Sequence, residues 1–74
     1  MSPEMAINIL CGSGNLSAES LNALHACRPG HPLNNPQQWR NAAFMITGRG
    51  PWIGDEHEAA YVIHRQAQLE QAAA

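Results

Sequence analysis

The stretch NNPQQWRNAAFMITG, residues 34–48, is where the signals for one kind of structure agree best. Asn35 is a good N-cap, Pro36 suits the first helical position, and Gln38 stands three residues after the cap as in a capping box. Gly48 follows where a left-handed C-terminal cap belongs. The apolar residues that recur at helical spacing on one face are Trp39, Ala42, Ala43 and Ile46. The stretch therefore predicts an amphipathic helix.

The preceding segment, LSAESLNALHACRPG, residues 16–30, carries a similar set of signals. Ser17 is a suitable N-cap, and Glu19 would lie in the first turn of the helix. Leu21, Leu24 and Cys27 follow at three-residue spacing, which gives one apolar face. Pro and Gly at positions 29 and 30 end the segment. We expect a second helix here.

Both ends of the chain also favour helices, with one ambiguity. Asp55 and Glu58 form an Asp-x-x-Glu start for a last helix, and the acidic run suits the positive end of a helix dipole. The segment SPEMAINIL, residues 2–10, begins with a capping serine and a proline, which favours a short helix. Its Ile7 and Ile9 alternate as in a strand, so a strand stays open for this segment.

These segments predict an all-α fold, a small single domain of three to four short helices that spans residues 1–74. Helices this short are marginal alone, so their apolar faces must pack together. We expect the residues Trp52 and Ile53 to fold back on the last helix. The predicted core consists of Leu21, Leu24, Trp39, Phe44, Ile46, Trp52, Ile53, Val62 and Ile63.

The size and charge of the chain restrict its function. A domain of 74 residues has little room for both a core and a deep pocket, which disfavours an enzyme with a small-molecule substrate. The formal net charge is −2, and the four basic residues, all arginines, are scattered along the chain. Nucleic-acid binding needs a basic face that releases counterions, so nucleic acid is a less favoured partner than protein.

The two cysteines and the N-terminal segment bear on the compartment. No basic region precedes an apolar stretch, so we expect no signal peptide. The apolar run near the start is too short to span a bilayer, so we expect no membrane partner. These features predict a cytoplasmic protein with reduced thiols and no cofactor.

The segment HEAAYVIH, residues 57–64, superficially resembles the zinc-protease motif, but its spacing is wrong. His57 and His64 are seven residues apart, which is about 10.5 Å along a helix, too far to chelate one zinc ion. On a helical projection, however, His57, Tyr61, His64 and Gln68 form one stripe. Ala59, Val62, Ile63 and Leu69 lie on the opposite side.

This stripe has two interpretations, an ordinary solvated face or a contact surface for a protein. Tyr, Trp and Arg are favoured at interface hot spots, and the loop GRGPWIG, residues 48–54, projects an arginine and a tryptophan beside the stripe. The candidate partner-binding residues are Arg49, Trp52, His57, Tyr61, His64 and Arg65. Since histidines usually titrate near pH 6.5, affinity for a partner would depend on pH if the two histidines lie in the interface.

Other motifs carry weaker signals. Cys11, His25, Cys27 and His31 are all possible zinc ligands, but their spacing fits no common zinc site, so we predict no metal centre. No histidine or carboxylate is tied to Cys11 by sequence, so we predict no catalytic residue. The glycine-rich segments lack the phosphate-loop patterns, and the chain has no lysine. Residues that could read bases, Gln37, Gln38, Arg40 and Asn41, lack surrounding positive charge.

The sequence thus predicts a small, non-enzymatic protein-binding regulator. Proteins of this size without catalytic signatures are typical of phage or plasmid regulators, so an inhibitor or modulator of host machinery is expected, with host RNA polymerase and its transcription complex as a plausible target. The alternatives are a small DNA-binding regulator and a zinc-stabilised module. Binding to DNA that weakens with salt would favour the first alternative, and folding that is lost with a chelator would favour the second.

Overall fold

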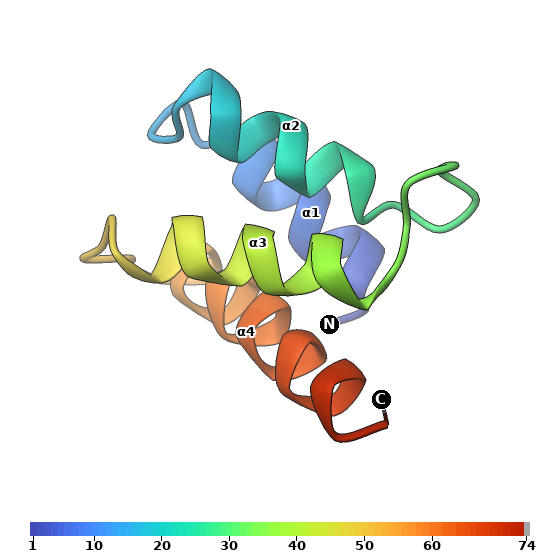
Figure 1. The fold of residues 1–74 in the computed structure, drawn as a ribbon. Helices are drawn as coiled ribbons and strands as arrows, with labels where there is room; N and C mark the ends of the chain where they lie inside the picture. The colour runs from blue at the N-terminus through green and yellow to red at the C-terminus, as the bar shows by residue number, and fades with distance from the viewer. Residues whose placement is uncertain (74) are drawn as a thin grey trace.

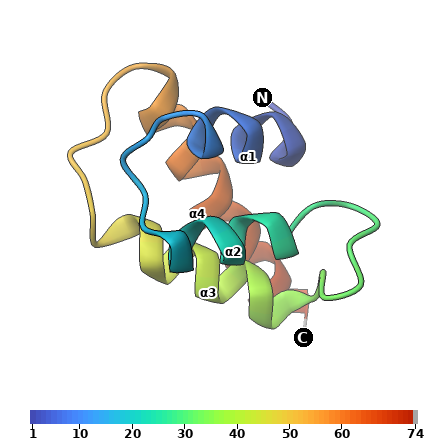
Figure 2. The ribbon, with the colours of Figure 1, turned by 90° about the horizontal axis from the view of Figure 1, so that it is seen from above.

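The computed structural model describes residues 1–73 and is all-helical over that range. Its helices are α1 (Pro3–Cys11), α2 (Ala18–Ala26), α3 (Pro36–Thr47) and α4 (Asp55–Ala73). The predicted fold class is therefore confirmed. Helix α4 packs against both α1 and α3, and α2 packs mainly against α3 (Figure 1). The α2–α3 and α3–α4 loops lie at opposite ends of the molecule (Figure 2).

The first segment is a helix and not a strand. The Ser2 side chain caps α1 by accepting a hydrogen bond from the backbone N–H of Met5 at 3.2 Å. Ile7 and Leu10, three residues apart on one helical face, are fully buried, whereas Ile9 is only partly buried. The buried residues therefore follow the helical period, and the apparent alternation of Ile7 and Ile9 does not decide the structure.

The caps predicted for the two middle helices are present. The Ser17 side chain accepts a hydrogen bond from the backbone N–H of Ser20 at 3.3 Å. The Asn35 side chain likewise accepts one from the backbone N–H of Gln38 at 3.1 Å. Each bond satisfies a backbone donor that has no partner within the helix.

Two predictions about helix ends are wrong. Gly48 follows α3 with a φ of −85°, so it is not the left-handed cap that its position suggested. Asp55 is the first residue of α4, and the backbone carbonyl of Gly54 accepts from the N–H groups of His57 and Glu58. Gly54, with a φ of 64°, thus takes the cap position that the Asp-x-x-Glu pattern gave to Asp55. The acidic residues still lie in the first turn of α4.

One hydrophobic core joins the four helices. Its largest fully buried side chains are Ile7, Leu10, Leu24, Ile46 and Ile63, with Cys27 and Ser20 beside them. Trp39 is also buried. Leu21, Trp52 and Val62, which we predicted as core, are only partly buried. Much of the remaining core is alanine, and the short side chains of Ala59, Ala60 and Ala67 form most of the buried face of α4.

Two predicted core residues lie on the surface instead. Phe44 is 83% exposed and Ile53 is 81% exposed. At 100° per residue, Phe44 lies roughly 150° round α3 from the centre of the face formed by Trp39, Ala42, Ala43 and Ile46. It therefore faces away from the core because of its helical position. Ile53 lies in the α3–α4 loop, where Trp52 packs against the core in its place.

No helix of the described chain is both long and apolar enough to cross a membrane.

Candidate functional site

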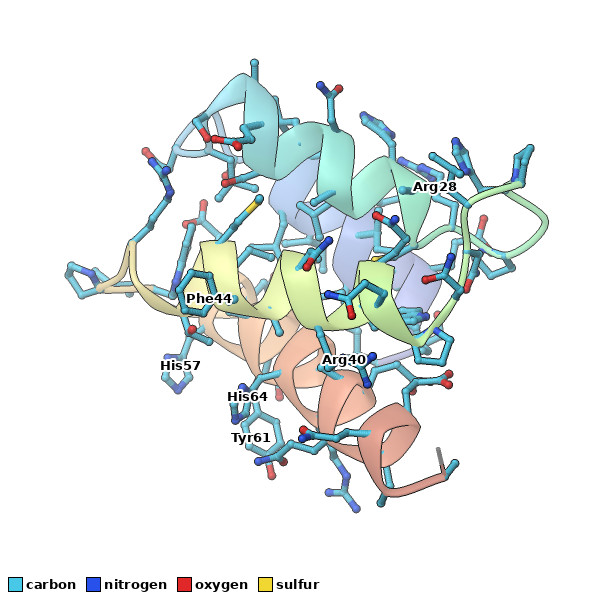
Figure 3. The ribbon with its side chains drawn as sticks, viewed as in Figure 1. Arg28, Arg40, Phe44, His57, Tyr61 and His64 are labelled. Atoms are coloured by element: carbon cyan, nitrogen blue, oxygen red, sulfur yellow. The ribbon has the colours of Figure 1, made fainter. Side chains whose placement is uncertain are left out.

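Four of the predicted partner-binding residues surround one open hollow between the end of α3 and the first half of α4. The hollow has a volume of about 200 Å³. Trp52 reaches it from the α3–α4 loop, and His57, Tyr61 and His64 reach it from successive turns of α4. Ala60 and Thr47 complete its lining. His57, Tyr61 and His64 gather on the same side of the molecule as Phe44 (Figure 3).

A second hollow of about 220 Å³ continues from the first along α3 and α4. Thr47 and His64 line both hollows, so the two hollows adjoin. The other residues that line the second hollow are Arg40, Ala43, Phe44, Ala67, Gln68 and Gln71. We refer to the residues that line either hollow as the α3–α4 groove.

Trp52 contributes both to the hydrophobic core and to the wall of the groove. Its indole packs against the hydrophobic core while one side faces the first hollow. The indole also lies close over Gly50, where an added Cβ would stand 3.4 Å from Trp52 Cδ1. Trp52 Nε1 is buried and has no hydrogen-bond partner among the described residues. This wall of the groove is therefore held by packing and not by a polar contact.

The two predicted arginines lie outside this groove. Arg49 lines a wider hollow with Glu19 and Met45, on the far side of Phe44 from the groove. Arg65 lines a separate hollow between α4 and the N-terminus, together with Met1 and Leu69. Tyr61 lies between that hollow and the first one, since it lines both. The predicted surface is therefore brought together around Trp52, His57, Tyr61 and His64.

Sequence reasoning missed Phe44 and Arg40 as surface residues of the site. Phe44 is the most exposed large hydrophobic side chain of the described chain, and it lies on the ridge between the groove and the hollow that holds Arg49. A helical projection of α3 contains this signal, because Phe44 falls opposite the apolar face. Arg40 lines the second hollow together with residues of α4 that are distant in sequence, and no local pattern reveals this neighbourhood.

Within the described residues, the predicted zinc-ligand candidates Cys11, His25, Cys27 and His31 form no metal site. No group of three or more His, Cys, Asp or Glu side chains in residues 1–73 is close enough to hold a metal ion. Cys27 is buried, and its thiol donates to the carbonyl oxygen of Ala23 at 3.2 Å. The Nδ1 atom of His31 accepts from the backbone N–H of Leu33 at 3.1 Å. The two side chains are thus engaged in local structure.

Cys11 does have a histidine neighbour, which the sequence did not reveal. Its sulfur lies 3.9 Å from Nε2 of His25, a long contact between α1 and α2. Arg28 donates from Nε to Nδ1 of His25 at 3.2 Å and from a terminal nitrogen to Oδ1 of Asn8 at 2.7 Å. Arg28 therefore links α1 to the end of α2, on the side of the molecule away from Phe44 (Figure 3).

Three of the four residues that could read DNA bases bond to one another along α3. Gln37 donates to Oδ1 of Asn41 at 2.8 Å, and Arg40 donates to Oε1 of Gln37 at 3.1 Å. These contacts occupy polar groups that base recognition would need. Arg40 is the one charged residue of α3, and a single positive charge is little for binding to phosphates.

Comparison with known proteins assigns the chain to no group: no protein-family model, no curated protein and no solved structure matches it.

Proposed function

We propose that the protein is a small non-enzymatic regulator that binds another protein through the α3–α4 groove and the aromatic side chains on its rim. The observation that carries this proposal is the exposure of Phe44 and Tyr61, 83% and 57%, on either side of an open depression. Aromatic side chains bury a large area in a contact at a small cost in conformational entropy. They are the anchors that protein interfaces favour.

The open form of the groove supports a protein partner over a small molecule. Its two hollows, of about 200 and 220 Å³, lie open on the surface and do not enclose a ligand as a small-molecule pocket does. A standard protein interface covers about 800 Å² per partner. That area is roughly a fifth of the 4431 Å² surface of this molecule, which one face can provide.

The mechanism in this proposal is occlusion or tethering. A domain that docks through one face blocks or redirects the partner surface that it covers, and no chemical step is needed. The small size and the absence of catalytic motifs in the sequence are typical of phage- or plasmid-type modulators of host machinery, and a transcription complex such as host RNA polymerase stays the expected class of target.

The test is affinity capture from a bacterial lysate with three immobilised proteins: wild type, the double variant Phe44→Ala/Tyr61→Ala, and the control Met5→Ala/Leu33→Ala. The control removes two apolar side chains that are 56% and 54% exposed and lie outside the groove. Circular dichroism first establishes that all three fold. We expect a stoichiometric protein partner on the wild type and the control, and at least about tenfold less on the groove variant.

Two results would contradict the proposal. One is equal capture of the partner by the groove variant, which would place the interface elsewhere. The other is capture of nucleic acid alone, with retention that falls steeply as salt rises, which would favour the DNA-binding alternative.

A further inference from the structure

The length and shape of the α3–α4 groove restrict what can occupy it. The groove follows α4 from His57 through His64 to Gln71. Fifteen residues of helix correspond to about 22 Å, or about four turns. The residues that line the groove where α3 meets α4 are small: Ala43, Ala60 and Ala67 are all nearly buried alanines. A ridge of side chains from another helix fits such a furrow between two helices.

The occupant must bind through its side chains. The groove is built by two helices, whose central backbone N–H and C=O groups are bonded within each helix. No strand is present in residues 1–73, so there is no sheet edge to which an extended peptide could add. A helix, which satisfies its own backbone and presents apolar side chains at intervals of three and four residues, meets this requirement.

The charge of the groove indicates which charge the polar side of that helix should carry. Arg40 lines the second hollow, and its guanidinium donates to the neutral amide oxygen of Gln37. No carboxylate is among the described residues that line the two hollows. Glu19 lines the hollow beyond Phe44, and Asp55 and Glu58 lie in the first turn of α4. The second hollow is thus the cationic end of the groove, in a chain whose net charge is −2.

We propose that the occupant of the α3–α4 groove is an acidic amphipathic helix of the partner protein. An apolar side chain of this helix lies between Phe44 and His64 against the alanines that line the groove, and a carboxylate about one turn away pairs with Arg40. The proposal rests on the proposed function, because it names the chemistry of the partner that the groove binds. Pairing with a carboxylate gives the guanidinium a charged acceptor in place of a neutral one.

The test uses a displayed library of helical peptides of about 14 residues, or about four turns. All peptides share one apolar stripe, and the flanking positions are randomised among Glu, Gln and Lys. The baits are the wild type, Arg40→Glu and Arg65→Glu. Arg65 is the matched control, since it carries the same charge on α4 but lines a different hollow.

We expect the wild type and Arg65→Glu to enrich peptides with glutamate on one flank of the stripe. Arg40→Glu should instead enrich lysine at the same positions. A selected acidic peptide should lose about tenfold in affinity with Arg40→Glu and regain it when its glutamate is changed to lysine, as expected for one charge pair at an interface. Amide chemical-shift changes on the wild type should follow Arg40, Phe44, Gln68 and Gln71.

Other outcomes would overturn the proposal. They are enrichment of lysine by the wild type, an equal effect of Arg40→Glu and Arg65→Glu, failure to enrich any peptide, or a dimer of this chain that Phe44→Ala dissociates. These results would not contradict the proposed function, which has its own test. That test is the capture of a whole protein by the wild type and its loss with Phe44→Ala/Tyr61→Ala. A captured protein together with failed peptide selection would keep the function and reject the acidic helix.

Discussion

The two cysteines differ in how deeply they are buried, and this difference gives them different chemistry. Cys27 is fully buried at the end of α2, and burial raises the pKa of its thiol from 9.0 to about 12. Cys11 is partly exposed at the end of α1, near His25. A buried thiol acts as a small apolar side chain, whereas an accessible one is open to reagents.

The raised pKa of Cys27 predicts a loss of stability at alkaline pH. Below pH 9 the thiol is neutral in both the folded and the unfolded chain, so it makes no pH-dependent contribution. Between pH 9 and about 12 the unfolded chain ionises and the folded one does not, so stability falls as pH rises. The maximum slope is about 1.4 kcal/mol per pH unit.

Urea denaturation at pH 8, 9 and about 10.5 measures this effect, for wild type, Cys27→Ala and Cys11→Ala. We expect the free energy of unfolding of the wild type and of Cys11→Ala to fall more steeply above pH 9 than that of Cys27→Ala. A Cys27→Ala slope equal to that of the wild type would show that this thiol ionises as freely in the folded chain as in the unfolded one.

Phe44 shows that residue type alone does not predict whether a side chain is buried. We expected it in the core because phenylalanine is large and apolar, but its position on α3 turns it outward. The buried face of α3 relies instead on two alanines, with Trp39 and Ile46. Burial here follows the helical register, and the exposed aromatic ring is available for a contact surface.

At the scale of elements, the helix starts were easier to predict than the helix ends. A cap is a bond between a side chain and a backbone N–H three residues later, so its signal lies within a few residues of sequence. The caps at Ser2, Ser17 and Asn35 formed as expected. The end of α2 depends instead on a residue from the following loop, Asn34.

Asn34 joins α2 to α3 by three hydrogen bonds. Its side-chain amide nitrogen donates to the carbonyl oxygens of Cys27 and Arg28, each at 2.9 Å. Its amide oxygen accepts from Nε1 of Trp39 at 3.3 Å. This one side chain therefore supplies hydrogen-bond partners to two backbone carbonyls after α2 and to the buried indole of Trp39 in α3.

Replacing Asn34 by alanine should destabilise the protein by about 1–3 kcal/mol, the cost of leaving such groups without a partner. The measurement is the midpoint of urea denaturation followed by tryptophan fluorescence. Asn22→Ala is the control, because Asn22 is an exposed residue of α2, and its effect should stay within about 0.5 kcal/mol. A loss with Asn34→Ala no larger than with Asn22→Ala would mean that water replaces the three bonds.

At the scale of the whole molecule, α4 organises the packing. It contacts both α1 and α3, and Ile63 in its middle is fully buried. Ile7 and Leu10 from α1 enter the same core as Ile46 from α3. A domain this small has no second core, so we expect its four helices to unfold together.

Leu10→Ala tests this cooperativity. Leu10 is fully buried in α1, and its truncation should cost about 2–5 kcal/mol. Because a core of this size rarely supplies more than roughly 3–5 kcal/mol, the truncation should remove much of the stability and lower the unfolding temperature strongly. Its thermal transition by circular dichroism, which reports on all helices, should coincide with that by tryptophan fluorescence. A fluorescence transition left at the wild-type temperature would show that α3 and α4 fold without α1.

The sequence by itself determined the helical class, the N-caps of α1, α2 and α3, and the stripe of α4 that faces solvent. These features depend on caps and on the 3.6-residue period, which act between residues at most a few turns apart. Local pattern also placed His57, Tyr61 and His64 together, since one helix carries them all.

The tertiary structure alone decided what lies beside that stripe. Trp52 lines the groove because the α3–α4 loop folds back, and Phe44 and Arg40 join it because α3 packs against α4. Arg49 and Arg65, close to the stripe in sequence, face other hollows. The relative position of two helices is set by how the side chains of both fill the space between them, and no single segment contains that information.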